Sequence, residues 1–256
     1  MEPNTTSQPV PPYSVLATVY DHMMSHVNYR RWTKYLLQLI RKTHIPIHRI
    51  LDIGCGTGKM VNEFHRQGFT IQGCDPSTAM LGVAQTHFPE LTFYRDALPF
   101  LPHTPSGHFN IALSLFDTIN YLPDREALIA SLETLYQKLE TPGVFIFDAV
   151  SPHLCEIHFN HVVEKEVLDE SYAYERYSYF DRHNLIQTNE ITIFTPEGVF
   201  TETHTQRIFP FHELTEIIQN CSPFRLFKAY EEFTFQPLHE SSMRGHFILV
   251  KGKEND

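Results

Sequence analysis

The ten residues 51–60, which read LDIGCGTGKM, constrain the fold more than any other part of the chain. They begin as a short apolar run typical of a buried strand, which Gly54, Gly56 and Gly58 then break ahead of a polar helix start. Glycine is needed where a backbone turns sharply or lets a ligand come closer than a Cβ would allow. The stretch predicts a strand, a tight turn and a helix, with ligand chemistry at the turn; a purely structural connection has the same pattern.

The glycine spacing distinguishes this turn from two other types of nucleotide-binding loop. A dinucleotide loop, G-x-G-x-x-G, would need its third glycine at position 59, where Lys59 stands, and a Walker phosphate loop needs a spacing that is also missing. A second expected strand, 70–73, is followed by Asp75. A carboxylate about 20 residues beyond such a loop is placed to accept both ribose hydroxyls of an adenosine.

Strands and helices alternate through the first 150 residues. Two helices, over 13–27 and 32–40, are expected to precede the first strand, and apolar runs then predict strands at 50–53, 70–73, 91–94, 109–115 and 143–150. Helices are expected at 57–67, 77–86 and 124–138, and a polar, proline-rich stretch at 99–108. Such alternation predicts a parallel sheet with helices on both faces and ligands at the carboxyl ends of the strands. Five aspartates lie at or near those ends: Asp52, Asp75, Asp96, Asp117 and Asp148.

The pattern changes after residue 152. Residues 162–209 alternate with a period of two and are divided by turn signals at 181–184 and 195–198, which predicts three or four antiparallel strands. A helix at 211–220 and strands at 224–230 and 244–251 follow. We therefore expect a disordered arm at 1–12 without a role in the chemistry, a core of 13–150 and 210–256, and a lid at 151–209 that selects the substrate.

These features together resemble the class I S-adenosylmethionine (SAM) dependent methyltransferases, in the small-molecule type with an antiparallel lid insertion, similar to methyltransferase domain 25. The resemblance implies a Rossmann-like α/β fold, with a seven-stranded, mainly parallel sheet that ends in a reversed hairpin and carries the insertion between strands five and six. It also implies SAM as cofactor, S-adenosylhomocysteine (SAH) as product, and transfer of a methyl group to nitrogen or oxygen of a small molecule by in-line displacement.

The same resemblance implies a set of cofactor-binding residues. Aromatic residues of the N-terminal helices would shield the sulfonium, Arg30 or Arg31 would pair with the methionyl carboxylate, and Asp96 would accept the adenine amino group. The structural alternatives are core packing for the aromatic residues and turn capping for Asp96. The expected set is Tyr20, Trp32, Asp52, Gly54, Cys55, Gly56, Gly58, Asp75, Pro76, Asp96, Ala97, Leu115, Phe116 and Asp117.

The lid offers the candidates for a general base. His158, Tyr172, Tyr174 and His204 carry suitable groups, although alternating tyrosines most often pack within strands. No metal is implied; a magnesium site would need carboxylates after strands four and five, a place that Asp117 and Asp148 loosely offer.

Composition narrows the function classes. A net charge of −10 argues against a nucleic-acid substrate, and scattered cysteines without a signal peptide or long apolar span predict a cytoplasmic protein with no membrane contact. We expect a monomer or homodimer acting on a small molecule. The open alternatives are a non-catalytic SAM- or SAH-binding interaction protein and a protein methyltransferase; a nicotinamide-dependent reductase is disfavoured because the Tyr-x-x-x-Lys pair is missing.

Overall fold

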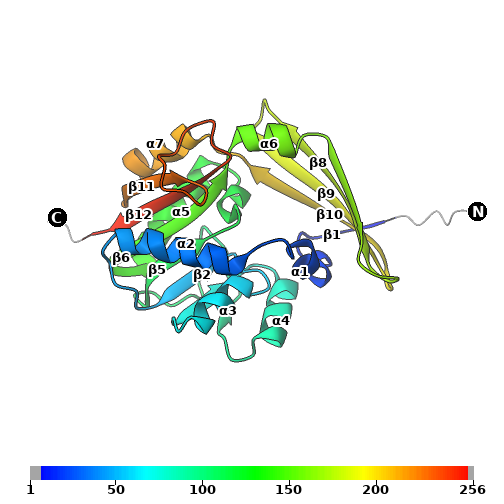
Figure 1. Ribbon diagram of the computed structural model, residues 1–256, viewed down its shortest axis with the longest axis horizontal. Helices are drawn as coiled ribbons and strands as arrows, with labels where there is room; N and C mark the ends of the chain where they lie inside the picture. The colour runs from blue at the N-terminus through cyan, green and yellow to red at the C-terminus, as the bar shows by residue number, and fades with distance from the viewer. Residues whose placement is uncertain (1–6, 253–256) are drawn as a thin grey trace, which may run out of the picture.

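The computed structural model describes residues 7–252 and contains two β-sheets (Figure 1). The larger sheet has seven strands in the order β11-β12-β6-β5-β2-β3-β4. Its strands are β2 (Ile50–Ile53), β3 (Ile71–Cys74), β4 (Phe93–Tyr94), β5 (Phe109–Ser114), β6 (Leu139–Val150), β11 (Arg225–Glu231) and β12 (Arg244–Lys251). The first five are parallel, and β12 runs antiparallel to both β6 and β11. The expected seven-stranded, mainly parallel sheet with a reversed final hairpin is confirmed.

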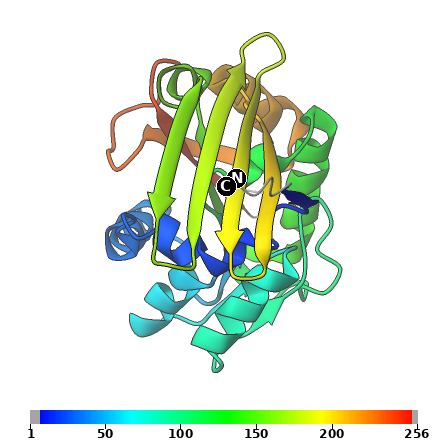
Figure 2. The same ribbon diagram turned by 90° about the vertical axis from the view of Figure 1, so that its right-hand side faces the viewer.

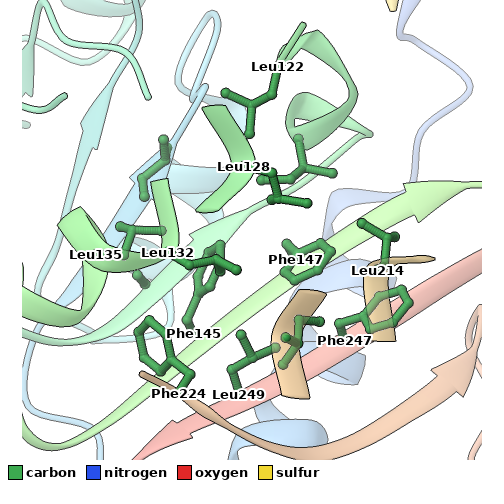
Figure 3. Close-up of a cluster of buried hydrophobic side chains, with 14 of the residues drawn as sticks. Leu122, Leu128, Leu132, Leu135, Phe145, Phe147, Leu214, Phe224, Phe247 and Leu249 are labelled. Carbon is green, nitrogen blue, oxygen red and sulfur yellow. The ribbon is translucent and has the colours of Figure 1, made fainter. Parts of the chain in front are cut away.

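Helices cover both faces of this sheet because its central strands are apolar on both sides. On one face, leucines of α5 and α7 pack against Phe145, Phe147 and Phe247 of the strands (Figure 3). On the other face, α2 and α3 pack against the alternate strand residues, among them Val144 and Ile146. The helices are α2 (Tyr29–Lys42), α3 (Lys59–Arg66), α4 (Thr78–His87), α5 (Arg125–Lys138) and α7 (Phe211–Cys221), with a short 3₁₀ helix η2 (Thr118–Tyr121).

The second sheet, which we call the lid sheet, has the strand order β1-β10-β9-β8-β7. Its four long strands lie in the chain between β6 and β11, as expected for the insertion, and the short helix α6 (Pro152–His158) leads into them. Figure 2 faces this sheet, which stands across the near side of the core. Its strands are β1 (Gln8–Val10), β7 (Val162–Val167), β8 (Ala173–Asp181), β9 (Ile186–Thr195) and β10 (Gly198–Arg207).

The N-terminal segment differs from the sequence expectation. Gln8, Pro9 and Val10 form β1 and pair in parallel with β10, so this part of the expected disordered arm is ordered. Residues 1–6 lie outside the described part of the chain. The helix expected over 13–27 is broken into η1 (Leu16–Thr18) and α1 (Tyr20–Met23). It cannot begin at Tyr13, whose φ of 58° lies in the left-handed region.

Within residues 7–252, no helix combines the length and apolar character needed to cross a membrane.

Candidate functional site

The glycine turn after β2 presents open backbone to a cavity of about 590 Å³. Gly54, Gly56 and Gly58 all have positive φ, between 53° and 78°, which a residue with a Cβ rarely adopts. A Cβ built on Gly56 would meet only the Tyr20 ring at 3.8 Å, whereas one on Gly54 would lie 2.6 Å from Thr118. Gly54 therefore packs the turn against η2, and Gly56 leaves room for a ligand.

This first cavity gathers most of the residues expected to bind the cofactor. It is lined by Tyr20, Asp52, Gly54, Cys55, Gly56, Asp75, Pro76, Asp96, Ala97, Leu115 and Phe116. Three expected residues lie elsewhere: Gly58 packs against Phe93 and Ala84, while Trp32 and Asp117 line a second cavity. Trp32 is a core residue whose ring contacts Phe116 at 4.6 Å between centroids.

Several residues that line the first cavity were not expected from the sequence. Pro11, Pro12 and Tyr13 from the N-terminal segment close one side of the cavity, and Ser77 and Tyr121 also line it. The Ser77 hydroxyl caps α4 and donates to the backbone oxygen of Tyr13. The segment expected to be an inert arm is thus part of the site.

Asp52 and Asp75 stand at the ends of neighbouring strands with different surroundings. Asp75 accepts hydrogen bonds from the backbone N–H groups of Gly56 (2.9 Å) and Ser77 (2.8 Å). Burial raises the pKa of Asp75 to about 6, against the opposing effect of these two bonds. The Asp52 carboxylate accepts no hydrogen bond from any residue in 7–252, and burial, with the charge of Asp75, raises its pKa to about 7. A buried carboxylate without a partner favours a cationic ligand.

Asp96 does not offer a free carboxylate to the cavity. Its two oxygens accept hydrogen bonds from the backbone and ring of His103 and from the backbone and hydroxyl of Thr104, at 2.7 to 3.2 Å. Its side chain has no exposed surface. These bonds agree with the capping alternative, in which Asp96 fixes the loop that carries Ala97. Its role toward the adenine amino group stays a prediction.

The second cavity, of about 690 Å³, lies between the carboxyl edge of the core sheet and the inner face of the lid sheet. Polar side chains of β9 and β10 line it on the lid side: Gln187, Asn189, His204 and Gln206. Trp32, Asp117, Glu232 and Arg244 line it on the core side.

Arg244, at the start of β12, organises the core side of the second cavity. Its guanidinium pairs with Asp117 (2.9 Å), with Asp148, and with Glu232 (3.5 Å). Burial raises the pKa of Asp148 to about 6, although the Arg244 charge opposes this. Asp117 also accepts a hydrogen bond from Gln206 of the lid sheet (2.7 Å). Asp117 and Asp148 thus bind an arginine, and within residues 7–252 no three His, Cys, Asp or Glu side chains form a metal-binding group.

The structure brings only one of the four candidate bases to the second cavity. His204 lines it and is 2% exposed. His158 is exposed on α6, Tyr172 packs at the edge of a lid cluster, and Tyr174 is buried and donates to Glu166 at 2.7 Å. The positions of the two tyrosines agree with the packing alternative.

Four aromatic residues line both cavities: Tyr13, Tyr20, Phe116 and Tyr121. The Tyr13 ring lies edge-on to Tyr20 at 5.9 Å and 5.8 Å from Tyr121, as measured between ring centroids. We call these four residues the junction. These shared residues place the two cavities side by side.

Comparisons with known proteins agree with this architecture. A family model described as "Methyltransferase domain" matches residues 50–143. The putative methyltransferase YqeM of Bacillus subtilis is 29% identical over 249 residues, which is 94% of this chain and 98% of that protein. A SAM-dependent methyltransferase of Clostridium acetobutylicum has a similar structure, with a TM-score of 0.78 at 18% identity over 93% of this chain and 98% of the other. The sugar N-methyltransferase KedS8 of Streptoalloteichus also has a similar structure, with a TM-score of 0.73 at 18% identity over 92% of this chain and 93% of the other.

Proposed function

We propose that the chain is a class I SAM-dependent methyltransferase and that it transfers the methyl group to a nitrogen or oxygen atom of a polar small molecule. The observation that carries this proposal is the junction. One cavity has the glycine turn and the buried carboxylates, the other has a polar lining, and the two share Tyr13, Tyr20, Phe116 and Tyr121.

The residues of the first cavity fit SAM. Asp75 is held by two backbone N–H groups and keeps lone pairs for the ribose hydroxyls. Asp52, without a partner in residues 7–252, suits the α-ammonium group of the methionine portion, and Gly56 lets the ligand approach the backbone. When bound, SAM supplies a methyl group on a positively charged sulfur.

The chain's own task is then to hold the acceptor in line behind that methyl group and to exclude water. We propose that residues 13–150 and 210–256 bind the cofactor and that 151–209 select the acceptor. The N-terminal segment closes the first cavity, and the junction rings surround the transfer path. Aromatic faces stabilise a cationic sulfur.

The lining of the second cavity supports a hydroxyl- or amine-bearing acceptor. Amide, imidazole and carboxylate groups favour a molecule that offers many hydrogen-bonding groups over a flat apolar one. That KedS8, a protein of the same fold, is a sugar N-methyltransferase adds support. Amino sugars and hydroxylated small molecules are therefore the first acceptors to test.

SAH formation in a panel of amino sugars, polyols and phenols, with basic peptides as a separate arm, tests the proposal. We expect turnover with at least one small molecule and none with the peptides. Gln206→Leu should raise the KM for that acceptor without changing SAH affinity, because Gln206 faces the second cavity. Thr205→Leu, on the exposed face of the same strand, is the control. Turnover with peptides alone, or tight SAH binding with no turnover in any arm, contradicts the proposal.

A further inference from the structure

Three alternate residues of β10 point toward the core: Glu202, His204 and Gln206 are buried, whereas the residues between them are exposed. Glu202 has no exposed surface and His204 is 2% exposed. A buried carboxylate beside a buried imidazole is costly unless both groups are fully hydrogen-bonded. The hydrogen-bond partners of Glu202 and His204 therefore set the charge and the proton positions of the pair.

The N-terminal segment surrounds Glu202 with donors. The backbone N–H groups of Tyr13 (2.6 Å), Val15 (2.8 Å) and Leu16 (2.8 Å) donate to its two oxygens. Burial by itself raises the pKa of Glu202, but the hydrogen bond from His204 and these backbone bonds outweigh it, so the pKa lies below its usual value. Glu202 is therefore ionised and only accepts hydrogen bonds.

An ionised Glu202 sets the direction of every further hydrogen bond. His204 must donate from Nε2 to Glu202 (3.0 Å), so in the neutral ring Nδ1 is the acceptor. The Tyr121 hydroxyl, 3.2 Å from Nδ1, then donates to His204. With its proton so used, Tyr121 accepts from the Tyr13 hydroxyl at 2.7 Å. Tyr13 is left with lone pairs at the junction.

The two tyrosine hydroxyls are the middle members of this series of hydrogen bonds. Burial raises the pKa of Tyr13 well above its usual value and also raises that of Tyr121. Both hydroxyls therefore stay protonated at neutral pH. The imidazole is the group in the chain that can accept a proton, with the Glu202 charge beside it to stabilise the cation.

We propose that Tyr13, Tyr121 and His204 form a proton relay that takes the proton from the acceptor's hydroxyl or ammonium group at the junction. The relay rests on the proposed function and restricts it to acceptors with a proton on the methylated atom. Tyr13 is the catalytic residue, because it touches the acceptor. His204 acts through the two tyrosines, and Glu202 is a positioning residue.

The step balances in atoms and electrons. The acceptor's lone pair forms the new bond to the methyl carbon, and the sulfur–methyl bond breaks with its electron pair staying on sulfur. The acceptor's proton moves to the Tyr13 oxygen, the Tyr13 proton to Tyr121, and the Tyr121 proton to Nδ1 of His204. The resulting imidazolium is paired with Glu202.

NMR of labelled histidine ring nitrogens in the SAH-loaded protein tests the direction of the relay without an acceptor. We expect the neutral ring of His204 to carry its proton on Nε2, with an Nδ1 signal that moves in Tyr121→Phe. Tyr179→Phe, on the lid strand β8 and outside the relay, should leave that signal in place. A proton on Nδ1, or an Nδ1 signal that is indifferent to Tyr121→Phe, overturns the relay.

Kinetics with the acceptor found by the panel tests its use in catalysis. Tyr13→Phe and Tyr121→Phe should each lower kcat by about 10²-fold or more, with SAH affinity unchanged, because the proton loses its path. Added imidazole should restore part of the activity lost in His204→Ala, because the second cavity is open to small molecules. Unchanged kcat in both tyrosine variants overturns the relay. Wild-type protein without turnover contradicts the proposed function instead, and the NMR result still decides the hydrogen-bond direction.

Discussion

At the scale of single residues, Asp52 and Asp75, which we propose bind the cofactor, are buried at a cost to the ligand-free protein. Burial raises the pKa of Asp52 from 3.8 to about 7, so the folded chain holds a proton there that the unfolded chain releases at lower pH. This contribution to stability is complete below about pH 4 and is lost as the pH rises through about 7. A cationic ligand would reverse the effect by favouring the ionised carboxylate.

Asp52→Asn should therefore stabilise the ligand-free protein at high pH. We expect a higher Tm than wild type at about pH 8. The gain in unfolding free energy there is at most about 4 kcal/mol, and both differences shrink toward about pH 4. Thermal unfolding across that range measures it. Glu133→Gln, exposed on α5, is the matched control. A Tm difference that does not change with pH contradicts the pKa argument.

The residues that the sequence located follow from strand geometry, and the contacts that it did not reveal depend on irregular loops or on distant partners. Asp52 and Asp75 were predictable because carboxyl ends of parallel strands share one edge of a sheet. The hydrogen-bond partners of Asp96 were not, because His103 and Thr104 reach its carboxylate through an irregular loop. Arg244 meets Asp117 across 127 positions of sequence, with no local pattern to signal the pair.

At the scale of elements, the N-terminal segment joins the two halves of the site. It pairs with β10 through β1, donates to Glu202 and lines the first cavity with Pro11 and Pro12. Its prolines and lack of apolar period predicted an inert arm, because a three-residue strand has too little sequence to show a pattern and its partner is about 190 positions away.

Removal of residues 1–12 should weaken SAH binding while the core stays folded. We expect at least about a tenfold loss of affinity, equal to 1.4 kcal/mol, because one wall of the first cavity is lost. Removal of residues 1–6 alone, which keeps β1 and both prolines, is the control and should bind like wild type. Calorimetry gives the affinities, and equal values for the two truncations would exclude the segment from the site.

At the scale of the whole molecule, the architecture follows from two periodicities in one chain. Five parallel strands, joined by helices except between β4 and β5, build most of the core sheet, and period-two strands build the lid sheet. How the sheets meet was not predictable, since it depends on contacts such as Gln206 with Asp117 and Tyr121 with His204. These contacts form the second cavity and the junction.

Binding of SAM in the first cavity by two carboxylates with separate tasks is the proposal on which the whole site depends. Its most direct test is calorimetric titration of wild type, Asp75→Asn and Asp52→Asn with SAH and with 5′-methylthioadenosine, which has the same adenosine but no amino acid. We predict that Asp75→Asn weakens binding of both ligands and that Asp52→Asn weakens binding of SAH alone. Unchanged binding of both ligands in both variants, or no SAH binding by folded wild type, would contradict the account.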